Sequence, residues 1–434
     1  MKKFFLKYIT IFRVLAVAAT LIVVVSSSSK MIRSPLAKGD TSVYLHAAEV
    51  ILNGGNIYAT TQIPAEQGGS YYLYLPLLAI LFVPFTFLPI NISIVLWTLI
   101  NVLLVFWSVK TFYEAMTGHR FFDLTTVERW VMMGIPILLT LRYLLHNLSY
   151  GQVNILILAM LVLALKYGRR EHGILQGIWA GLAGIVKVTA VPFMFWLFIK
   201  EGLKTKAGLF AGVLLGAVLI PSLVVGFGVN LDYVAYWLNN IVLSDSLTAS
   251  HVPGSINTSV TAVLNRLFGN EPAMNLNGMP IYFTLVNLSP AALSFLSKAS
   301  QLLVLATLGY YAFRFRKSDD LYSRWGGAAF AFTMIPLFAP TAQKHYFVVL
   351  LPAYVFSVYV WHFVGNRDKW FRGLVAASAA IAGLGLQELL GETVSDAMFA
   401  AGALPLGTML LAAAIFRAAQ NGILANEPIT DTVS

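Results

Sequence analysis

The chain contains no cysteine, which excludes disulfide bridges and metal sites built on thiolates. It is also poor in charge, because Asp, Glu, Lys and Arg make up 11% of its 434 residues whereas hydrophobic residues make up 58%. This balance, with a mean hydropathy of +0.75, excludes a soluble globular enzyme. The sequence also lacks a phosphate-binding glycine loop, a zinc motif and any sign of a nucleotide-sugar fold. The composition predicts a polytopic membrane protein.

Acidic residues are the scarcer charge, with 19 Asp and Glu against 29 Lys and Arg. The basic residues form short clusters between apolar runs rather than a continuous patch, so we expect no nucleic-acid partner. Such clusters mark cytoplasmic loops under the positive-inside rule. We therefore assign the basic loops 314–324 and 365–372 to the cytoplasm, and the acidic segment 386–397 to the external side.

Apolar runs close to the roughly 20 residues that cross a bilayer predict most of the spans. They lie at residues 5–25, 91–113, 129–146, 151–166, 207–226, 291–313, 325–340, 346–363, 373–390 and 398–416. The first run has a basic start, as a signal peptide does, but no clear small-x-small cleavage site follows it. We interpret it as an uncleaved span.

Two further regions need separate interpretation. Basic clusters flank residues 173–200 on both sides, so both flanks are expected in the cytoplasm. Two short helices that meet near Lys187 satisfy this condition and place that lysine at a hairpin tip in the outer half of the membrane. A single long span with Lys187 at mid-depth is the alternative. In residues 71–89, three prolines favour a re-entrant or shallow segment that does not cross.

The predicted fold is all-α, with about twelve transmembrane helices, a re-entrant or juxtamembrane segment and external amphipathic helices. We expect a single integral membrane domain over residues 1–434, with both termini in the cytoplasm. Two long loops, 26–70 and 227–290, are predicted to be external.

The first of these loops contains a helical pattern that starts at Asp40. Polar residues recur on one face and apolar residues on the other, and the pattern stops at Gly54 and Gly55. This indicates an amphipathic helix on the outer surface. Asp40 falls in the first turn, where an aspartate commonly caps the helix by accepting backbone N–H groups. Capping and catalysis are compatible roles for it.

Other polar side chains are predicted to converge on the same side of the membrane. The segment "LLHNLSYGQVNILIL" carries several of them at the junction of two spans, and "FAPTAQKHYFVVLLP" carries more at another junction. A single interfacial Lys or His is most often a residue that contacts lipid headgroups. Together with Lys187, these groups would surround one anionic headgroup beside a carboxylate base.

The same segments resemble a known family. "GDTSVYLHAAEVILNGGNIYA", "YLYLPLLAILFVPFTFLP", "NLSYGQVNILILAMLVLAL", "GIWAGLAGIVKVTAVP", "NTSVTAVLNRLF" and "QKHYFVVLLP" are similar, in order and spacing, to glycosyltransferase family 87 of the GT-C superfamily. The resemblance covers roughly residues 35–360. One departure is "SINTSV" after the seventh span, where the family pattern leads us to expect an Asn-Gln-Ser-like triplet.

The resemblance implies a GT-C-like fold and a mannosyltransferase that depends on polyprenyl-phosphate-mannose, with an active site open to the outer face. It places the catalytic acid in the first external loop, at Asp40. We assign the donor phosphate to Lys187, Lys344 and His345. The residues that we expect to contact substrate are Tyr44, Glu49, Tyr74, His146, Gln152, Asn154 and Asn257.

A lipid-phosphate leaving group is already an anion, so transfer with inversion needs one carboxylate base and no paired acid. We therefore expect an inverting hexosyltransferase that uses a polyprenyl-phosphate sugar and a glycolipid or glycan acceptor, without a cofactor, at the outer face of a bacterial inner membrane. The polyprenyl tail would enter from the lipid near residues 71–89. Tyr71, Tyr72 and Tyr74 could stack on sugar, but for most of them an interfacial belt is the favoured interpretation.

Two other classes of function remain open at the level of sequence. A secondary transporter or flippase also has about twelve spans, but it would need a polar path through the bilayer, whereas the polar groups here gather on one side. A non-catalytic scaffold for envelope assembly is the second alternative. The acids Asp232, Asp245, Glu49 and Glu388 could furnish a metal site, but their spacing does not require one, so we expect none.

Overall fold

The computed structural model describes residues 9–33, 39–60, 72–169, 172–243, 256–316, 320–383 and 390–424. The sequence-based interpretations of Tyr71, Asp245 and Glu388 lie outside these residues.

Long apolar helices dominate the described part of the chain and confirm an all-α polytopic membrane protein. Seven segments there are long and apolar enough to cross a bilayer. They are formed by α2 (Ile9–Arg33), α6 (Ile90–Thr117), α7 (Thr126–Tyr150), α11 (Leu203–Leu214) with α12 (Ile220–Val225), α15 (Pro290–Arg314), α17 (Leu351–His362) with the preceding turns Lys344–Leu350, and α21 (Ala403–Leu424). The count of twelve spans stays a prediction.

Shorter elements fill the space between the long helices and cover one end of them. The helices are α3 (Gly39–Leu52), α4 (Ile57–Thr60), α5 (Pro76–Thr86), α8 (Asn154–Arg169), α9 (Gly173–Val186), α10 (Val191–Lys200), α13 (Phe227–Trp237), α14 (Val260–Phe268), α16 (Gly327–Phe338), α18 (Lys369–Gly383) and α20 (Glu392–Ala400). The strands β1 (Met274–Leu276) and β2 (Met279–Ile281) pair antiparallel and form a small hairpin that the all-α prediction did not include.

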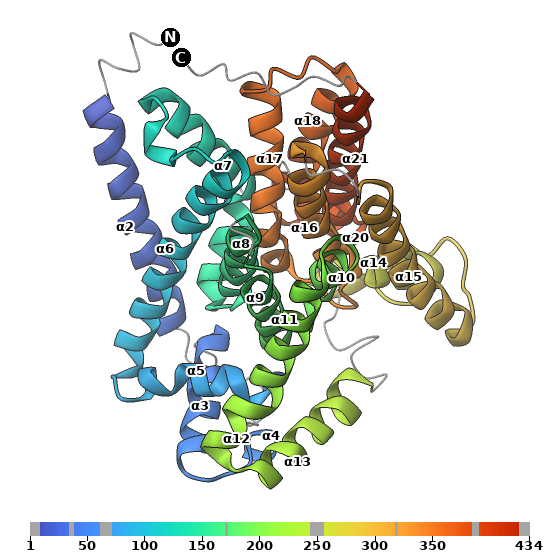
Figure 1. Ribbon diagram of the computed structural model, residues 1–434. Coiled ribbons are helices and arrows are strands. Elements are labelled where there is room, and N and C mark those ends of the chain that lie inside the picture. Colours follow the sequence, from blue (N-terminus) through green and yellow to red (C-terminus); the bar gives the residue numbers. More distant parts are fainter. Residues whose placement is uncertain are drawn as a thin grey trace.

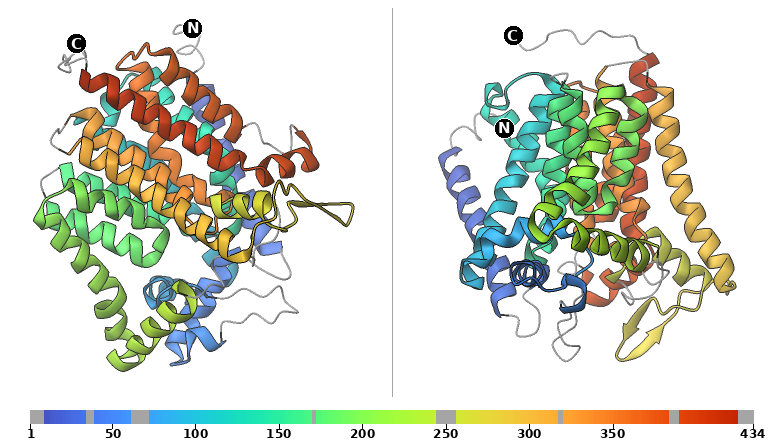
Figure 2. Two further views of the ribbon diagram at one scale, coloured as in Figure 1. Left: turned by 90° about the vertical axis from the view of Figure 1, so that its right-hand side faces the viewer. Right: turned by 60° about the horizontal axis from the view of Figure 1, so that its bottom comes forward.

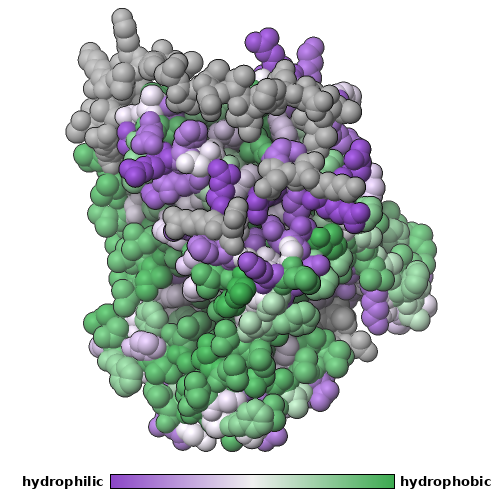
Figure 3. All heavy atoms as spheres, in the orientation of Figure 1, coloured by the Kyte–Doolittle hydropathy of each residue, from purple (hydrophilic) through white to green (hydrophobic). Residues whose placement is uncertain are grey.

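The elements separate into two ends of the molecule. The first residues of α2 and the last turns of α21 lie at the upper end of Figure 1, whereas α3, α4, α5, α12 and α13 gather at the lower end. The β-hairpin projects from the lower half of the molecule (Figure 2). On the face shown in Figure 3, hydrophilic side chains concentrate in the upper part and a broad apolar surface lies below them, with a thin hydrophilic fringe at the bottom. This is the surface expected of a protein embedded in a bilayer.

The predicted hairpin around Lys187 is confirmed. Helix α9 ends at Val186, and α10 begins at Val191 after one short turn. At the other end of the pair, Gln176 Nε2 in α9 donates to Glu201 Oε1 just after α10, at 3.5 Å. Both flanks of the pair therefore lie at the same end of the molecule, and Lys187 lies at the tip.

Helix α5 agrees with a segment that does not cross. Its 11 residues span about 16 Å, which is half of a hydrocarbon core. Pro76 occupies its first turn and Pro89 caps α6, so two of the three prolines mark helix starts, while Pro84 lies inside α5. Figure 1 shows α5 lying across the lower ends of the long helices.

The predicted boundary at residue 26 of the first loop is wrong, because α2 continues to Arg33. Helix α3 forms as predicted and ends at Leu52, and the turn that follows contains Gly54, whose φ is +67°. It does not lie on a membrane surface with its apolar face in lipid, however. Val43, Ala47 and Ile51 are buried against protein, and α5 is its principal neighbour.

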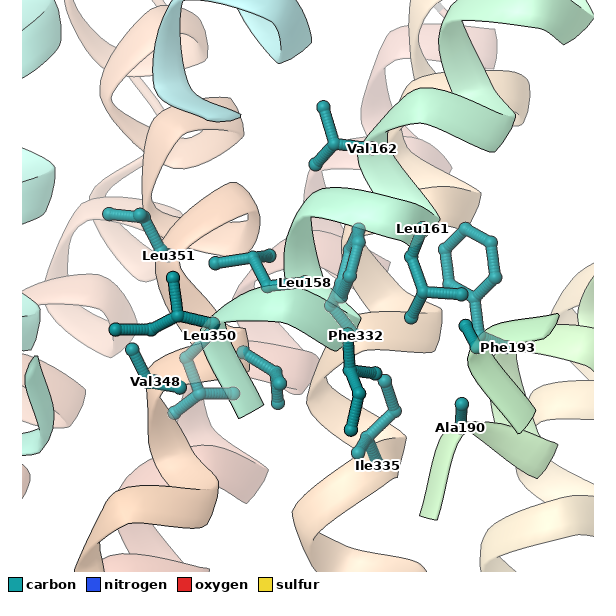
Figure 4. Close-up of a cluster of buried hydrophobic side chains, with 14 of the residues drawn as sticks. Leu158, Leu161, Val162, Ala190, Phe193, Phe332, Ile335, Val348, Leu350 and Leu351 are labelled. Carbon is teal, nitrogen blue, oxygen red and sulfur yellow. The ribbon is translucent and has the colours of Figure 1, made fainter. Parts of the chain in front are cut away.

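The core that supports the site is a continuous cluster of aliphatic and aromatic side chains. Helix α8 lies at its centre, and 11 of its 16 residues are buried. Figure 4 shows part of this cluster, with side chains from α8, the turn before α10, α10, α16, the turns Lys344–Leu350 and the start of α17: Leu158, Leu161, Val162, Ala190, Phe193, Phe332, Ile335, Val348, Leu350 and Leu351. This packing fixes the first residue of α8 relative to the lysine hairpin.

Candidate active site

Asp40 is positioned by the residue before it. Gly39 has a φ of +65°, and a Cβ atom there would lie 2.5 Å from the carbonyl oxygen of Tyr150 at the end of α7. Glycine is the residue that tolerates both the left-handed backbone and the close approach. The start of α3 is thereby held against the turn between α7 and α8.

That turn is held by two further elements. The carbonyl oxygen of Gly151 accepts hydrogen bonds from Trp97 Nε1 in α6 at 2.9 Å and from Thr41 Oγ1 in α3 at 3.3 Å. Gly151 has a φ of +64°, and any Cβ atom there would overlap Thr41 Oγ1. Asp40 therefore projects from a backbone that is fixed from α3, α6 and α7 together.

Lys187 lies at the hairpin tip and is 8% exposed. Its Nζ donates a hydrogen bond to Asn154 Oδ1 at 2.9 Å and lies 4.0 Å from the ring centre of Tyr346. Asn154 Nδ2 donates in turn to Asn147 Oδ1 at 3.2 Å and to the carbonyl of His345 at 3.3 Å. One asparagine thus joins the lysine hairpin to α7 and to the segment before α17.

Tyr44, one turn after Asp40, extends the same network. Its hydroxyl donates to Gln152 Oε1 at 3.3 Å and lies 3.3 Å from the hydroxyl of Tyr74. Since Tyr44 has one hydroxyl proton and gives it to Gln152, Tyr74 is the donor in the second contact. The Tyr44 ring also packs against Phe82 of α5. Helix α3, the α7–α8 turn and the segment before α5 therefore meet at one point.

Two histidines form the neighbouring wall. His146 Nδ1 lies 3.2 Å from His345 Nδ1, and the His146 ring stacks on Tyr150 with ring centres 4.5 Å apart. Lys344 directly precedes His345 in the sequence, and its Nζ lies 4.6 Å from the ring centre of Phe399 in α20. Basic groups from two segments, α7 and the turns before α17, therefore lie beside the Lys187 network.

The electrostatics at Asp40 differ from those of a helix cap. Within the described residues, no backbone N–H donates to its carboxylate, so the structure does not support the capping role there. Burial raises the pKa of Asp40 to about 6, and the positive charge of Lys187 acts in the opposite direction. A carboxylate with this pKa is ionised near neutral pH and can accept a proton.

Comparison with protein-family models adds an independent observation. Residues 72–340, more than half of the chain, match the model of glycosyltransferase family 87. The chain belongs to glycosyltransferase family 87. No curated protein and no solved structure matches it. Family membership identifies a glycosyltransferase and excludes the transporter and scaffold alternatives. It also implies a sugar donor and an acceptor in a membrane environment.

The family 87 match begins at Tyr72 and ends at Pro340. It therefore includes the hairpin lysine and the α7–α8 turn, but not Asp40, Tyr44, Glu49, Lys344 or His345. The structure places four of these five in or beside the network described above. Their roles in this glycosyltransferase stay predictions.

Two residues that were predicted to contact substrate are not part of this network: one lies away from Asp40, and the other holds two backbone segments together. Glu49 is exposed, lies 3.9 Å from His46 Nδ1, and is about 14 Å along the α3 axis from Asp40. Asn257 is buried, and its Oδ1 accepts from the backbone N–H groups of Ser259 and Ala342, each at 3.2 Å. In this glycosyltransferase Asn257 therefore ties the "SINTSV" segment to the loop before Lys344.

The interfacial-belt interpretation is wrong for Tyr72, which is 2% exposed and hydrogen-bonds to the backbone of Leu75 and Ala79. One contact was missed altogether. Tyr346 supplies the ring beneath Lys187, and the only sequence signal for it is its position directly after His345.

Metal ligation finds no support in the described part of this glycosyltransferase, where no three His, Asp or Glu side chains gather in a group that could hold an ion.

Proposed function

We propose that this family 87 glycosyltransferase moves a hexose, with mannose as the first candidate, from a polyprenyl-phosphate donor to an acceptor hydroxyl at the outer face of the membrane. The observation that carries the proposal is that α3, which carries Asp40, meets the lysine hairpin at Tyr74, whose hydroxyl lies 3.3 Å from that of Tyr44 and whose ring centre lies 6.0 Å from Lys187 Nζ. The Asp40 carboxylate has no capping partner in the described residues, the positive charge of Lys187 acts to lower its pKa, and Asn154 holds that buried lysine in place. An acceptor proton needs a base and a donor phosphate needs a cation, and these two residues offer one of each.

In the proposed reaction, Asp40 takes the proton of the acceptor hydroxyl as its oxygen forms a bond to the anomeric carbon. The bond between that carbon and the phosphate oxygen breaks, and polyprenyl phosphate leaves with the bonding electrons. The anomeric carbon inverts in this single displacement. One base suffices because the leaving group needs no proton.

Lys187 is proposed to stabilise the charge that develops on the departing phosphate. Its burial supports this role, since a cation acts more strongly on a nearby anion where bulk water is excluded. The backbone carbonyl of His345 adjoins it through the Asn154 contact, and Lys344 and His345 are proposed to bind the same phosphate. Tyr44, Tyr74, His146 and Gln152 offer hydroxyl, ring and amide groups to the sugar and the acceptor.

The experiment compares Asp40→Asn with Asp40→Glu and with Asp232→Asn, a matched loss of an exposed acid on α13. Membranes that contain each variant receive synthetic polyprenyl-phosphate-mannose labelled in the sugar, and label in the lipid and glycan fractions is counted. We expect Asp40→Asn to lower transfer by about 10²- to 10⁴-fold, the contribution typical of a general base. Asp232→Asn should transfer at the unaltered rate. Undiminished transfer by Asp40→Asn would refute the assignment.

A further inference from the structure

A polar cavity lies at the opposite end of helix α8 from the network around Asn154 and Lys187. It has a volume of about 500 Å³, and its lining comes from the end of α8, the start of α9, the start of α11 and the segment before α16. Helix α8 runs from Asn154 in the network to Arg169 in the cavity lining, a length of about 24 Å. The cavity is therefore separate from the site of transfer, and binding of a ligand there does not depend on the proposed function.

Three cations line this cavity, from three different elements: Arg169 of α8, Lys204 of α11 and Arg324 before α16. One acid, Glu201, also lines it and pairs with Arg324 at 3.2 Å. Three positive charges and one negative charge leave a net charge of +2 in the lining. The cavity is therefore suited to an anion.

The Arg324 guanidinium is held in a fixed position. It contacts Glu201 on one side and the carbonyl oxygen of Gly168 at 3.4 Å on another. Gln176 and Thr205 form the floor, where they hydrogen-bond to each other at 3.0 Å and are almost fully buried. The walls are thus preformed, and the exposed cations Arg169 and Lys204 stand at the cavity edge.

Backbone donors add to this charge. Helices α9 and α11 both begin at the cavity, and neither start carries a side-chain cap. The first N–H groups of a helix have no partner within the helix, and the helix dipole favours negative charge there. The two starts lie close together, since a Cβ atom at Gly173 would be 3.0 Å from Thr205 Oγ1. Together with the cations, they match the oxygen atoms of a phosphate group.

We propose that this cavity binds a phosphate-bearing headgroup, either of an anionic phospholipid in the leaflet opposite the transfer site or of a soluble phosphate compound. The lipid source is favoured because the cavity opens among basic side chains at the end of membrane-embedded helices, where anionic lipid headgroups lie.

The test compares the double variant Arg169→Gln/Lys204→Gln with the control Arg316→Gln/Lys369→Gln. Both remove one Arg and one Lys at exposed positions, and neither Arg316 nor Lys369 lines the cavity. Native mass spectrometry of the purified full chain, with equal phosphatidylglycerol and phosphatidylcholine, measures lipid binding. A thermal-unfolding titration with inorganic phosphate measures binding of the soluble ion.

We expect the unaltered chain to bind phosphatidylglycerol in preference to phosphatidylcholine. The cavity variant should bind phosphatidylglycerol about tenfold more weakly, and the control should bind it as the unaltered chain does. Stabilisation by inorganic phosphate that disappears only in the cavity variant would support the site with a soluble ligand as its source. Equal loss in both double variants would overturn the proposal. So would the absence of any difference between them with either ligand.

Discussion

Asn154 uses every polar atom of its side chain: the carbonyl accepts from Lys187, and the amide donates to Asn147 and to the backbone of His345. An amide bound in this way cannot rotate without breaking several hydrogen bonds in a buried place. The position of the lysine charge opposite Asp40 is therefore set by a neutral residue at the start of α8.

The pH dependence of transfer tests this arrangement. Because burial raises the pKa of Asp40 to about 6, we expect kcat/KM to fall below about pH 6, as the base becomes protonated. Lys187→Met removes the charge that lowers this pKa, so the acidic limb should move to higher pH. Lys187→Arg keeps the positive charge, so the acidic limb should stay at the same pH.

The measurement is the pH profile of sugar transfer in membranes that contain each variant. Loss of activity in Lys187→Met without a shift of the limb would show that the lysine has no electrostatic effect on Asp40.

Single residues were predictable where a pattern or a family position marked them. Asp40 and Lys187 stood out as rare charges beside apolar runs, and the positive-inside rule placed both on the same side of the membrane. Tyr346 did not stand out, because the chain has 19 tyrosines and one more at the start of a span has no distinguishing pattern. Its position under Lys187 comes from the tight turns Lys344–Leu350, which no periodicity indicates.

Among the secondary-structure elements, helices α9 and α11 pack against each other through faces that carry glycine. A Cβ atom at Gly177 or Gly208 would overlap backbone atoms of the opposite helix, and Gly181 and Gly212 continue the same contact. Small residues four apart let helix backbones approach closely in a membrane. This contact carries the lysine hairpin, so it also sets where Lys187 lies.

Substitution at this contact should weaken the fold. We expect Gly208→Ala to lower the free energy of unfolding by about 1–3 kcal/mol, the usual cost of overpacking, because its methyl group meets the carbonyl of Ile174. Gly373→Ala in α18 is the matched control, since open space surrounds that glycine. Thermal unfolding in detergent measures both, and an equal effect of the two substitutions would contradict the close contact.

Hydropathy predicted which segments form helices better than it predicted the residues at which those helices end. The length of the first apolar run predicted a span that stops near Val25, directly before four serines. It continues to Arg33, and Ser27 and Ser28 are 4% and 2% exposed, packed inside the protein. A polar run signals a helix end only where water reaches it, and that depends on neighbours that lie far away in sequence.

The whole molecule places two polar regions at opposite ends of one apolar body. The proposed transfer site lies where α3, the lysine hairpin tip and the α7–α8 turn meet, and the basic cavity lies where α8 ends and α9 starts. The distribution of charge along the sequence predicted this division, because the positive-inside rule assigns all basic loops to the same side of the membrane. It could not predict which polar side chains within an end would touch.

The absence of cysteine makes the sidedness measurable. We expect Asn53→Cys, at the exposed end of α3, to react with a membrane-impermeant maleimide in intact cells. Lys369→Cys, at the start of α18, should react only after the membrane is opened. Labelling of Lys369→Cys alone in intact cells would place Asp40 in the cytoplasm and exclude transfer at the outer face.

The contact between His146 and His345 joins like atoms, Nδ1 to Nδ1. While both rings are neutral, one Nδ1 must carry the hydrogen and the other must accept it, so the two imidazoles are opposite tautomers. The ring that donates keeps a lone pair at Nε2, whereas its neighbour keeps an Nε2–H. A proton that crosses this one bond, with the matching exchange at the outer nitrogens, reverses the hydrogen-bond polarity of the wall and leaves its net charge unchanged.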